Sequence, residues 1–152
     1  MLPWEKPLAL IDVDIDRKHY NYCYGCGTDN PLGLKLAFHW DGRTATTRFT
    51  AGKVHQGWPE TMHGGLVCTI LDEAIGWAAY YKGIKGVTGK LVVRLKRPVA
   101  VGQTLAIAAV IVKESRKLVQ SSATITLPDG TVAAEATATI YVIPQNGRKD
   151  KP

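Results

Sequence analysis

The chain has 152 residues, 45% of them apolar, which fits one globular domain with a buried core. Its formal net charge of +6 favours a polyanionic partner, either nucleic acid or a phosphate-bearing small molecule. The odd number of cysteines, the lack of a signal-peptide pattern and the absence of a membrane-length apolar run argue against a disulfide framework and a membrane anchor. They predict a cytoplasmic protein.

Residues 1–33 form an N-terminal segment that contains a C-x-x-C motif, Cys23 and Cys26. A tetrahedral zinc site needs further ligands, and the sequence has no second C-x-x-C or H-x-x-x-H to supply them. Gly25, Gly27 and the run at 29–31 are typical of turns. We therefore predict a structural turn with no metal ligand and no cofactor, while a metal or redox role is the alternative that the motif leaves open.

Hydrophobic periodicity predicts a hairpin, one long helix and then a meander of strands. The helix covers roughly residues 65–81, after a loop at 51–62, and the glycines at 83 and 86 are expected to stop it. The predicted strands are 34–40, 44–49, 88–97, 103–114, 118–127 and 131–142. Asp41-Gly42 and Pro128-Asp129-Gly130 are the turn signals within this pattern. The tail at 144–152 is expected to be a flexible, basic, solvated end.

The most informative feature is a pair of carboxylates, Asp72 and Glu73, in the middle of the apolar helix. A helix that is apolar on nearly all faces is expected to be buried, and burying a polar group without a partner costs about 2–7 kcal/mol. Proteins usually keep such a group for chemistry or for a specific partner. The two side chains point about 100° apart around the helix and so cannot share one role.

These elements predict an α+β fold in which an antiparallel sheet wraps one long central helix. Such a subunit leaves strand edges exposed, and joining two sheets in a dimer would cover them. A homodimer or a homotetramer built as a dimer of dimers is therefore expected.

Several motifs together resemble the hotdog-fold acyl-CoA thioesterases of the PaaI-like kind. They are an H-G-G at 63–65 followed nine positions after the histidine by Asp72, a strand with an R-P-x-x-x-G ending at 97–102, and the Asp129-Gly130 hairpin before 132–136. The resemblance implies a hotdog domain at 34–143 and a thioesterase that hydrolyses an acyl-CoA to a free acid and CoA. It also implies a site formed between two subunits.

On this resemblance Asp72 is the general base or the nucleophile, with base favoured. Helix dipoles and glycine backbones suit anionic ligands, so the Gly65 N–H is the expected oxyanion donor and Gly64 allows the close turn. His63 orients the loop or binds the thioester, and Thr88 matches a position whose hydroxyl helps to place the water or the substrate. Each of these residues also has a structural interpretation. The two glycines would form a tight turn without a ligand, and Asp72 would be a carboxylate paired for structural reasons. His63 would be a histidine with satisfied hydrogen bonds, and Thr88 an ordinary strand residue.

The resemblance also suggests residues for substrate binding. Several members carry an asparagine six residues before the H-G-G histidine, where this chain has Gly57, and Gln56 or His55 would have to replace its contact. Glu73 is a second candidate on the helix. Arg97, Arg116 and Lys117 are candidates for the CoA phosphates, although a solvated surface position is the simpler interpretation of any one cation.

Two other functions remain open: a non-catalytic acyl-CoA binding or sensing protein, and a hotdog acyl dehydratase. No nucleic-acid partner is predicted, because the chain lacks a basic stripe interleaved with aromatics. No membrane partner is predicted either. The aromatic residues Trp58, Trp77, Tyr80 and Tyr81 would suit an aromatic or medium-chain acyl group, but such spacings more often indicate core packing.

Overall fold

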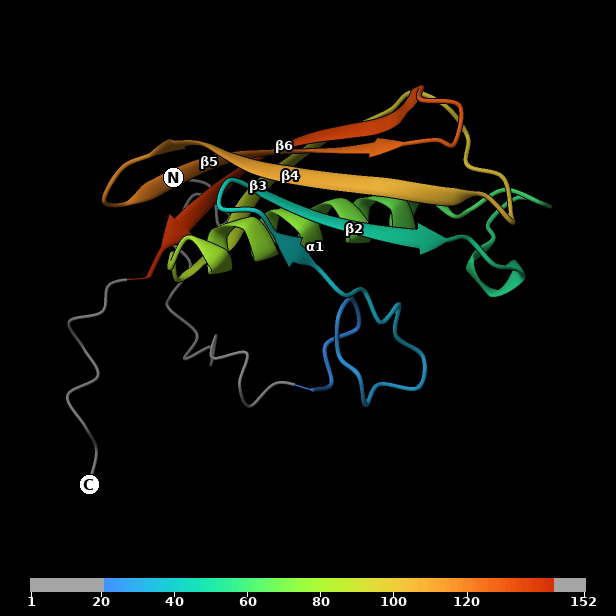
Figure 1. Ribbon diagram of the computed structural model, residues 1–152, viewed down its shortest axis with the longest axis horizontal. Helices are drawn as coiled ribbons and strands as arrows, with labels where there is room; N and C mark the ends of the chain where they lie inside the picture. Colours follow the sequence, from blue (N-terminus) through green and yellow to red (C-terminus); the bar gives the residue numbers. More distant parts are fainter. Residues whose placement is uncertain (1–20, 144–152) are drawn as a thin grey trace, which may run out of the picture.

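The computed structural model describes residues 21–143. The expected tail at 144–152 and the first twenty residues of the N-terminal segment lie outside the described residues. Within the described part, six antiparallel strands form one sheet in the order β1-β2-β4-β5-β6-β3. The sheet curves over a single long helix, α1, as Figure 1 shows. This confirms the predicted α+β layout.

The strands agree closely with the predicted segments, apart from the first. Their bounds are β1 His39–Trp40, β2 Thr44–Thr50, β3 Gly86–Leu95, β4 Thr104–Glu114, β5 Leu118–Thr126 and β6 Val132–Val142. Gly42 and Gly130 have φ of 98° and 87°, in the left-handed region that the tight turns before β2 and β6 require. The two turn signals in the sequence are thus confirmed.

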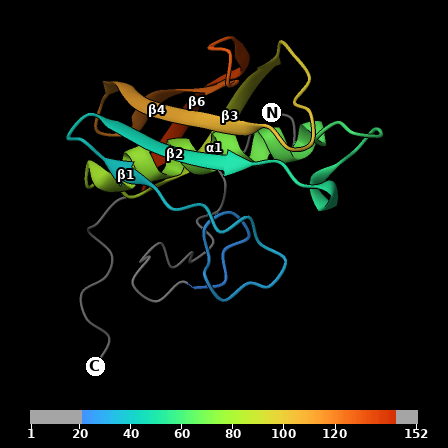
Figure 2. The same ribbon diagram turned by 45° about the vertical axis from the view of Figure 1, so that its right-hand side comes forward.

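The helix α1 spans Gly64–Tyr81 and lies against the concave side of the sheet (Figure 2). His63 is its N-cap, with a side chain that accepts a hydrogen bond from the Gly65 N–H. Gly83, with φ of 74°, follows the C-cap residue Lys82 and lets the chain leave the helix in a left-handed conformation. None of the described helices is long and apolar enough to cross a membrane.

One face of α1 supplies the centre of the core. Its fully buried residues are Ile70, Leu71, Ala74, Ile75 and Ala78. They pack against alternate residues of the strands, such as Leu105, Ile107 and Ile125, which are at most 1% exposed. At about 25 cal/mol per Å² of apolar area, this layer supplies most of the driving force that holds α1 on the sheet.

Residues 34–38 differ from the prediction because they belong to no strand of the sheet, and Lys35 among them has a φ of 53°. Their alternation is real, since Leu34, Leu36 and Phe38 are all buried. Their backbone partners, however, lie in the C-x-x-C segment: Leu34 N–H donates to the Tyr24 carbonyl at 2.8 Å, and Leu36 N–H to the Gly25 carbonyl at 2.9 Å. In Figure 1 this segment, in blue, lies on the side of α1 opposite the sheet.

The strand β3 forms one edge of the sheet and pairs only with β6. Its register shifts between Thr88 and Lys90, which marks a bulge at Gly89. A side chain at Gly89 would clash with the ring of Tyr141, so this position needs glycine. The bulge changes the direction of the strand next to Thr88, a candidate site residue.

Candidate active site

The H-G-G motif forms the start of α1 and directly follows the loop at 51–62. His63 N–H donates to the His55 carbonyl at 2.8 Å, and Met62 N–H to the Val99 carbonyl at 2.8 Å. A Cβ placed on Gly57 would lie 3.2 Å from the Cα and the Cδ2 of His63. Glycine at 57 therefore allows the loop to pack directly against the histidine.

The Gly65 N–H, the expected oxyanion donor, is already bound. It donates to His63 Nδ1 at 2.9 Å, which makes His63 the helix cap. Among the described residues the Gly64 N–H has no hydrogen-bond partner. The two neighbouring N–H groups at the helix start therefore differ, and Gly64 offers the open one.

Asp72 is exposed in the single subunit, which corrects the expectation that this carboxylate is buried. The sheet covers only one face of α1. Gly65, Asp72 and Tyr80 repeat at helical spacing on the other face, and all three are exposed. The sequence pattern wrongly predicted burial of Asp72 because the residues around it on this uncovered face are themselves small or apolar.

Asp72 has one specific partner, Thr88 on the edge strand β3. The Thr88 hydroxyl donates to Asp72 Oδ1 at 2.9 Å. Two residues that were predicted separately as site residues thus lie together, on the face of α1 that the sheet leaves open. A carboxylate that holds one hydroxyl on one oxygen keeps its second oxygen for a water molecule or a substrate.

Glu73 points in another direction, as the helical geometry predicted. Its Oε1 accepts a hydrogen bond from Cys23 Sγ at 3.2 Å, and its Oε2 is buried without a hydrogen-bond partner among the described groups. The N-terminal segment covers it, so the geometry does not support Glu73 as a substrate contact.

Gln56 and His55, the candidates to replace the family asparagine, each use one atom within the loop. Gln56 Oε1 accepts from the Glu60 N–H at 3.3 Å. His55 Nδ1 accepts from the Gly52 N–H at 2.8 Å, and its ring makes an edge contact with Phe49 at 4.9 Å between centroids. Of the two, Gln56 lies next to Gly57 and retains its amide NH₂ as a donor toward a ligand.

The three candidate phosphate-binding cations lie at opposite ends of the sheet. Arg97 follows the end of β3, and a Cβ on Gly64 would lie 3.2 Å from Leu95 at that end. Arg116 and Lys117 lie in the turn between β4 and β5, where the Lys117 carbonyl accepts from Val142 N–H at 2.9 Å. Within one subunit only Arg97 is therefore on the side of the H-G-G motif.

The four candidate aromatics do not form one pocket. Trp77, Tyr80 and Tyr81 contact one another in tilted or edge-to-face arrangements, with centroids 5.3–6.0 Å apart. The Tyr81 hydroxyl donates to the Phe38 carbonyl at 2.9 Å, and its ring stacks on Trp40 at 5.4 Å, so this cluster joins the end of α1 to β1 and the residue before it. Trp58 is separate and 83% exposed on the loop that precedes the H-G-G motif.

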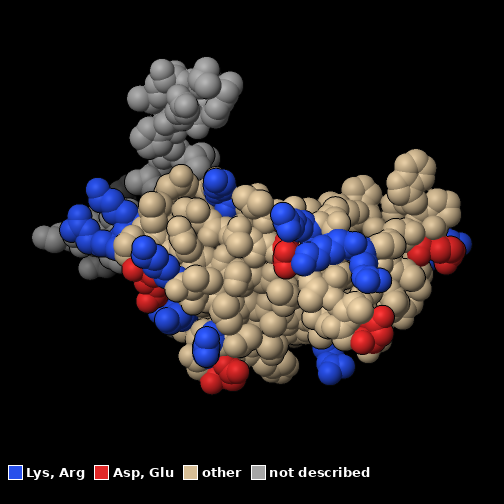
Figure 3. Space-filling view, turned by 90° about the horizontal axis from the view of Figure 1, so that it is seen from above, with Lys and Arg blue, Asp and Glu red and all other residues tan. Residues whose placement is uncertain are grey.

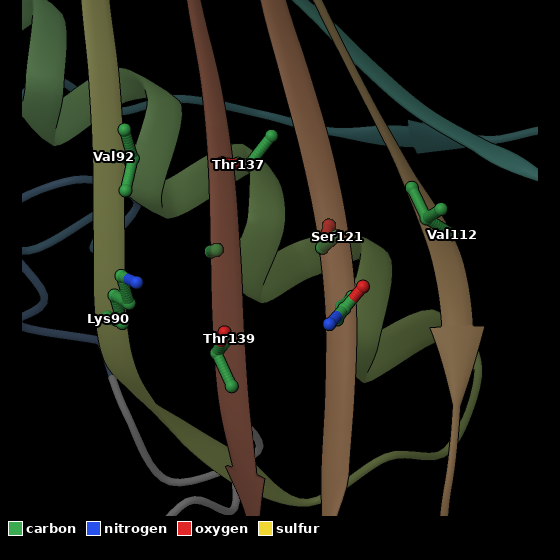
Figure 4. Close-up of a pocket in the computed structure, with 8 residues that line it drawn as sticks. Lys90, Val92, Val112, Ser121, Thr137 and Thr139 are labelled. Atoms are coloured by element: carbon green, nitrogen blue, oxygen red, sulfur yellow. The ribbon is translucent and has the colours of Figure 1, made fainter.

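A shallow pocket of about 290 Å³ lies on the outer face of the sheet, away from α1 (Figure 4). It is lined by Lys90, Val92, Val112, Gln120, Ser121, Thr137, Ala138 and Thr139. None of the predicted site residues lines this pocket. Figure 3 shows the same outer face, where Lys and Arg occur in small groups with acidic side chains among them rather than in one basic stripe.

Comparisons with known proteins agree with this architecture. The sequence profile of the thioesterase superfamily matches residues 60–134. The mouse protein named acyl-coenzyme A thioesterase THEM4 is 29% identical over 110 residues, which are 70% of this chain and 47% of the mouse protein. The chain thus spans about half the length of this curated relative.

Two solved structures show the same fold at low sequence identity. A hypothetical thioesterase from Streptococcus pneumoniae, solved with coenzyme A, has a TM-score of 0.69 and 20% identity, covering 72% of this chain and 87% of its own. The PaaI protein of the E. coli phenylacetic acid degradation operon has a TM-score of 0.68 and 18% identity, covering 71% and 83%. Over residues 60–134 the chain is thus similar to the thioesterase superfamily, and it has the hotdog fold of these structures.

Proposed function

We propose that this protein hydrolyses acyl-CoA thioesters, with Asp72 as the general base. The observation that carries the proposal is the 2.9 Å hydrogen bond from Thr88 to Asp72 on the uncovered face of α1. An exposed carboxylate held by one hydroxyl, in a chain that is similar to the thioesterase superfamily over residues 60–134, supports a role in accepting a proton from a water molecule.

The named relatives support the substrate class. The mouse relative is named an acyl-coenzyme A thioesterase, and the S. pneumoniae protein was solved with coenzyme A. That bacterial protein was also solved with alanine in place of an aspartate, and with alanine in place of a threonine sixteen positions further on. Asp72 and Thr88 have the same separation of 16 positions.

The reaction follows from these groups. Asp72 takes a proton from water, and the water oxygen forms a bond to the thioester carbonyl carbon. The tetrahedral intermediate then collapses, the carbon–sulfur bond breaks, and the CoA thiolate leaves and is protonated. Thr88 holds Oδ1, so the second carboxylate oxygen faces the water. A positioned general base typically contributes about 10²–10⁴ in rate.

The helix start supplies the donor for the negative oxygen of the intermediate. Because His63 Nδ1 occupies the Gly65 N–H, we assign the oxyanion to the Gly64 N–H first. The Gly65 N–H, the donor expected from the sequence, would join it only if the His63 ring turned away. The dipole of the 18-residue helix adds positive charge at this end. Losing one such donor typically lowers kcat by about 10²–10³.

The complete site requires two subunits. Gly65 and Asp72 are seven residues apart on one helix, a rise of about 10 Å along the axis, so one subunit does not bring both to the same carbonyl group. The exposed edge strand β3 offers an antiparallel partner surface next to Thr88. Pairing two copies there would set the Asp72 of one copy beside the H-G-G motif of the other.

The charge at the H-G-G end suits the nucleotide part of the substrate. Arg97 is exposed and follows the strand that contacts Gly64. Its planar guanidinium matches phosphate oxygens in a bidentate manner, so we assign it to the CoA phosphates. Arg116 and Lys117 remain candidates only for the far end of the ligand or for the second copy.

The test is thiol release from short, medium, long and aromatic acyl-CoAs by wild type, Asp72→Asn and the control Asp29→Asn. Asp29 is an exposed aspartate in the N-terminal segment, so its change matches the charge loss without touching the site. We expect release by wild type and Asp29→Asn, and a loss of about 10²–10⁴ in kcat for Asp72→Asn. Melting curves and sedimentation check that folding and assembly are unchanged.

Three outcomes would contradict the proposal. Turnover retained by Asp72→Asn would remove Asp72 as the base. Saturable binding of acyl-CoA without thiol release would point to the binding protein instead. A change in enoyl absorbance without thiol release would point to the dehydratase.

A further inference from the structure

We propose that Cys23, Cys26 and Glu73 form a zinc-binding site that joins the N-terminal segment to α1. The site is separate from the thioesterase site and does not depend on it. One ligand atom from each of the three residues lies within 4.8 Å of the others. Two of these residues come from the C-x-x-C turn, and the third lies fifty residues later on the helix.

The distances between the three ligand atoms are close to those between the ligands of a bound zinc ion. Two sulfur atoms that each lie about 2.3 Å from a tetrahedral zinc ion are about 3.8 Å apart. Atoms that already lie within 4.8 Å need only small side-chain rotations to reach this spacing. Cys23 Sγ also contacts Glu73 Oε1 at 3.2 Å, so the carboxylate is already turned toward the thiols.

The second oxygen of Glu73 supplies an independent argument. Glu73 Oε2 is buried and has no hydrogen-bond partner among the described groups. Leaving a buried acceptor unsatisfied costs about 1–3 kcal/mol, and more for a charged group. A thiol is a weak donor and compensates little. A cation held between the thiolates and the carboxylate would remove this cost.

The local backbone is shaped to bring these groups together. A side chain on Gly25 would clash with Glu73, so the glycine allows the turn to lie directly on the carboxylate. A side chain on Gly27 would clash with the backbone of Cys23, and its N–H donates to the Cys23 carbonyl at 2.8 Å. The turn predicted from the sequence is therefore real, and its glycines orient both cysteines toward the helix.

The chemistry of the ligands selects the metal. Two thiolates exclude Mg²⁺ and Ca²⁺, which prefer oxygen, and a carboxylate with thiolates suits tetrahedral Zn²⁺. On binding, each cysteine releases its thiol proton to solvent, and the ion keeps its oxidation state. Water would fill the fourth position. With the backbone bonds from 34–36 to the turn, the ion would fasten residues 21–38 to α1.

The first test uses the unaltered full-length protein. It is stripped with a chelator under reducing conditions, titrated with Zn²⁺, and then treated with a thiol-alkylating reagent whose sites are mapped by mass spectrometry. We expect one tightly bound zinc per chain, protection of Cys23 and Cys26, and no change in the labelling of Cys68. Cys68, on α1 outside the cluster, is the internal control.

The second test uses Co²⁺, whose thiolate charge-transfer absorbance reports directly on sulfur ligation. Glu73→Gln and the double change Cys23→Ser with Cys26→Ser are compared with Cys68→Ser and Glu114→Gln, which lie outside the cluster. We expect the double variant to lose the absorbance and Glu73→Gln to bind at least tenfold more weakly. Both controls should bind as wild type does. Circular dichroism confirms that each variant is folded.

The proposal fails if unaltered protein binds no more zinc than the double cysteine variant. It also fails if Zn²⁺ protects all three cysteines equally. Recovery of Cys23 and Cys26 as a disulfide that reforms in air and excludes zinc would assign the pair to redox chemistry instead.

Discussion

Thr88 on the edge strand β3 donates a 2.9 Å hydrogen bond to Asp72 on α1, across the open face of the subunit. The contact exists because β3 bulges at Gly89, the next residue, and the bulge redirects the strand beside Thr88. One hydrogen bond thus joins the helix and the sheet edge at the point where the proposed water molecule would be held.

Thr88→Ala should lower kcat, because the Asp72 carboxylate loses the donor that fixes its orientation. A hydrogen bond to a charged group is worth about 1.5–3 kcal/mol, which corresponds to a factor of about 10 to 160 in rate. Thr88→Ser keeps the hydroxyl and should retain most of the activity. Steady-state kinetics with the best acyl-CoA substrate measure both variants.

KM distinguishes this role from a merely structural one. If Thr88 positions the base, kcat falls with little change in KM, and serine rescues it. Equal losses in the alanine and serine variants would mean that the hydroxyl is not the operative group.

A charge on the edge strand should break the proposed dimer. Val92 is 50% exposed on β3, and Val92→Asp would place two like charges near each other across a symmetric β3–β3 junction. We expect a shift toward monomer in sedimentation and a parallel loss of thioesterase activity, because each proposed site is formed by both copies.

Val112→Asp is the matched control for this experiment. Val112 is 63% exposed and lines the same outer pocket as Val92, but it lies on β4, which has a neighbour on each side (Figure 4). It should leave the assembly unchanged. A dimer that survives Val92→Asp and dissociates with Val112→Asp would place the interface on the outer face of the sheet.

The sequence predicted the helix, five of the six strands and their turns because each has a clear local signal. The alternation at 34–38 also predicted burial correctly, but it did not reveal its partner. Those residues pair with the backbone of Tyr24 and Gly25 rather than with a strand, and such a choice depends on three-dimensional packing.

The candidate site was predictable to a similar degree. The resemblance supplied Asp72, Thr88 and the H-G-G motif, and the structure brings the first two together. Exposure of Asp72 was not predictable, because composition around the helix cannot show which face its own sheet leaves uncovered. The contact between Glu73 and Cys23 was not predicted, because no spacing rule links residues so far apart in the sequence. The signal in the sequence was Glu73 itself, a second carboxylate with no catalytic role of its own in an apolar helix.

His63→Ala should destabilise the protein by removing the cap of α1. His63 Nδ1 accepts the Gly65 N–H, and loss of an N-cap side chain typically costs about 1 kcal/mol. His63→Asn supplies another capping acceptor and should recover most of this loss. Thermal melting measures both, and an unchanged melting temperature in the alanine variant would show that water caps the helix equally well.

Acid should weaken the hairpin before β6 through Asp129. The Thr131 hydroxyl and the Thr131 N–H donate to Asp129 Oδ1, at 2.7 and 2.9 Å. These bonds, with the positive charge of Arg97 nearby, lower the pKa of Asp129 below its ordinary value of 3.8. A lowered pKa in the folded state means that the stabilisation is present above about pH 4 and is lost as the pH falls through the folded-state value.

Asp129→Ala should therefore melt below wild type at pH 7, and the difference in melting temperature should shrink as the pH drops below 3.8. A difference independent of pH would mean that the carboxylate charge contributes nothing and that the alanine acts only on the turn geometry.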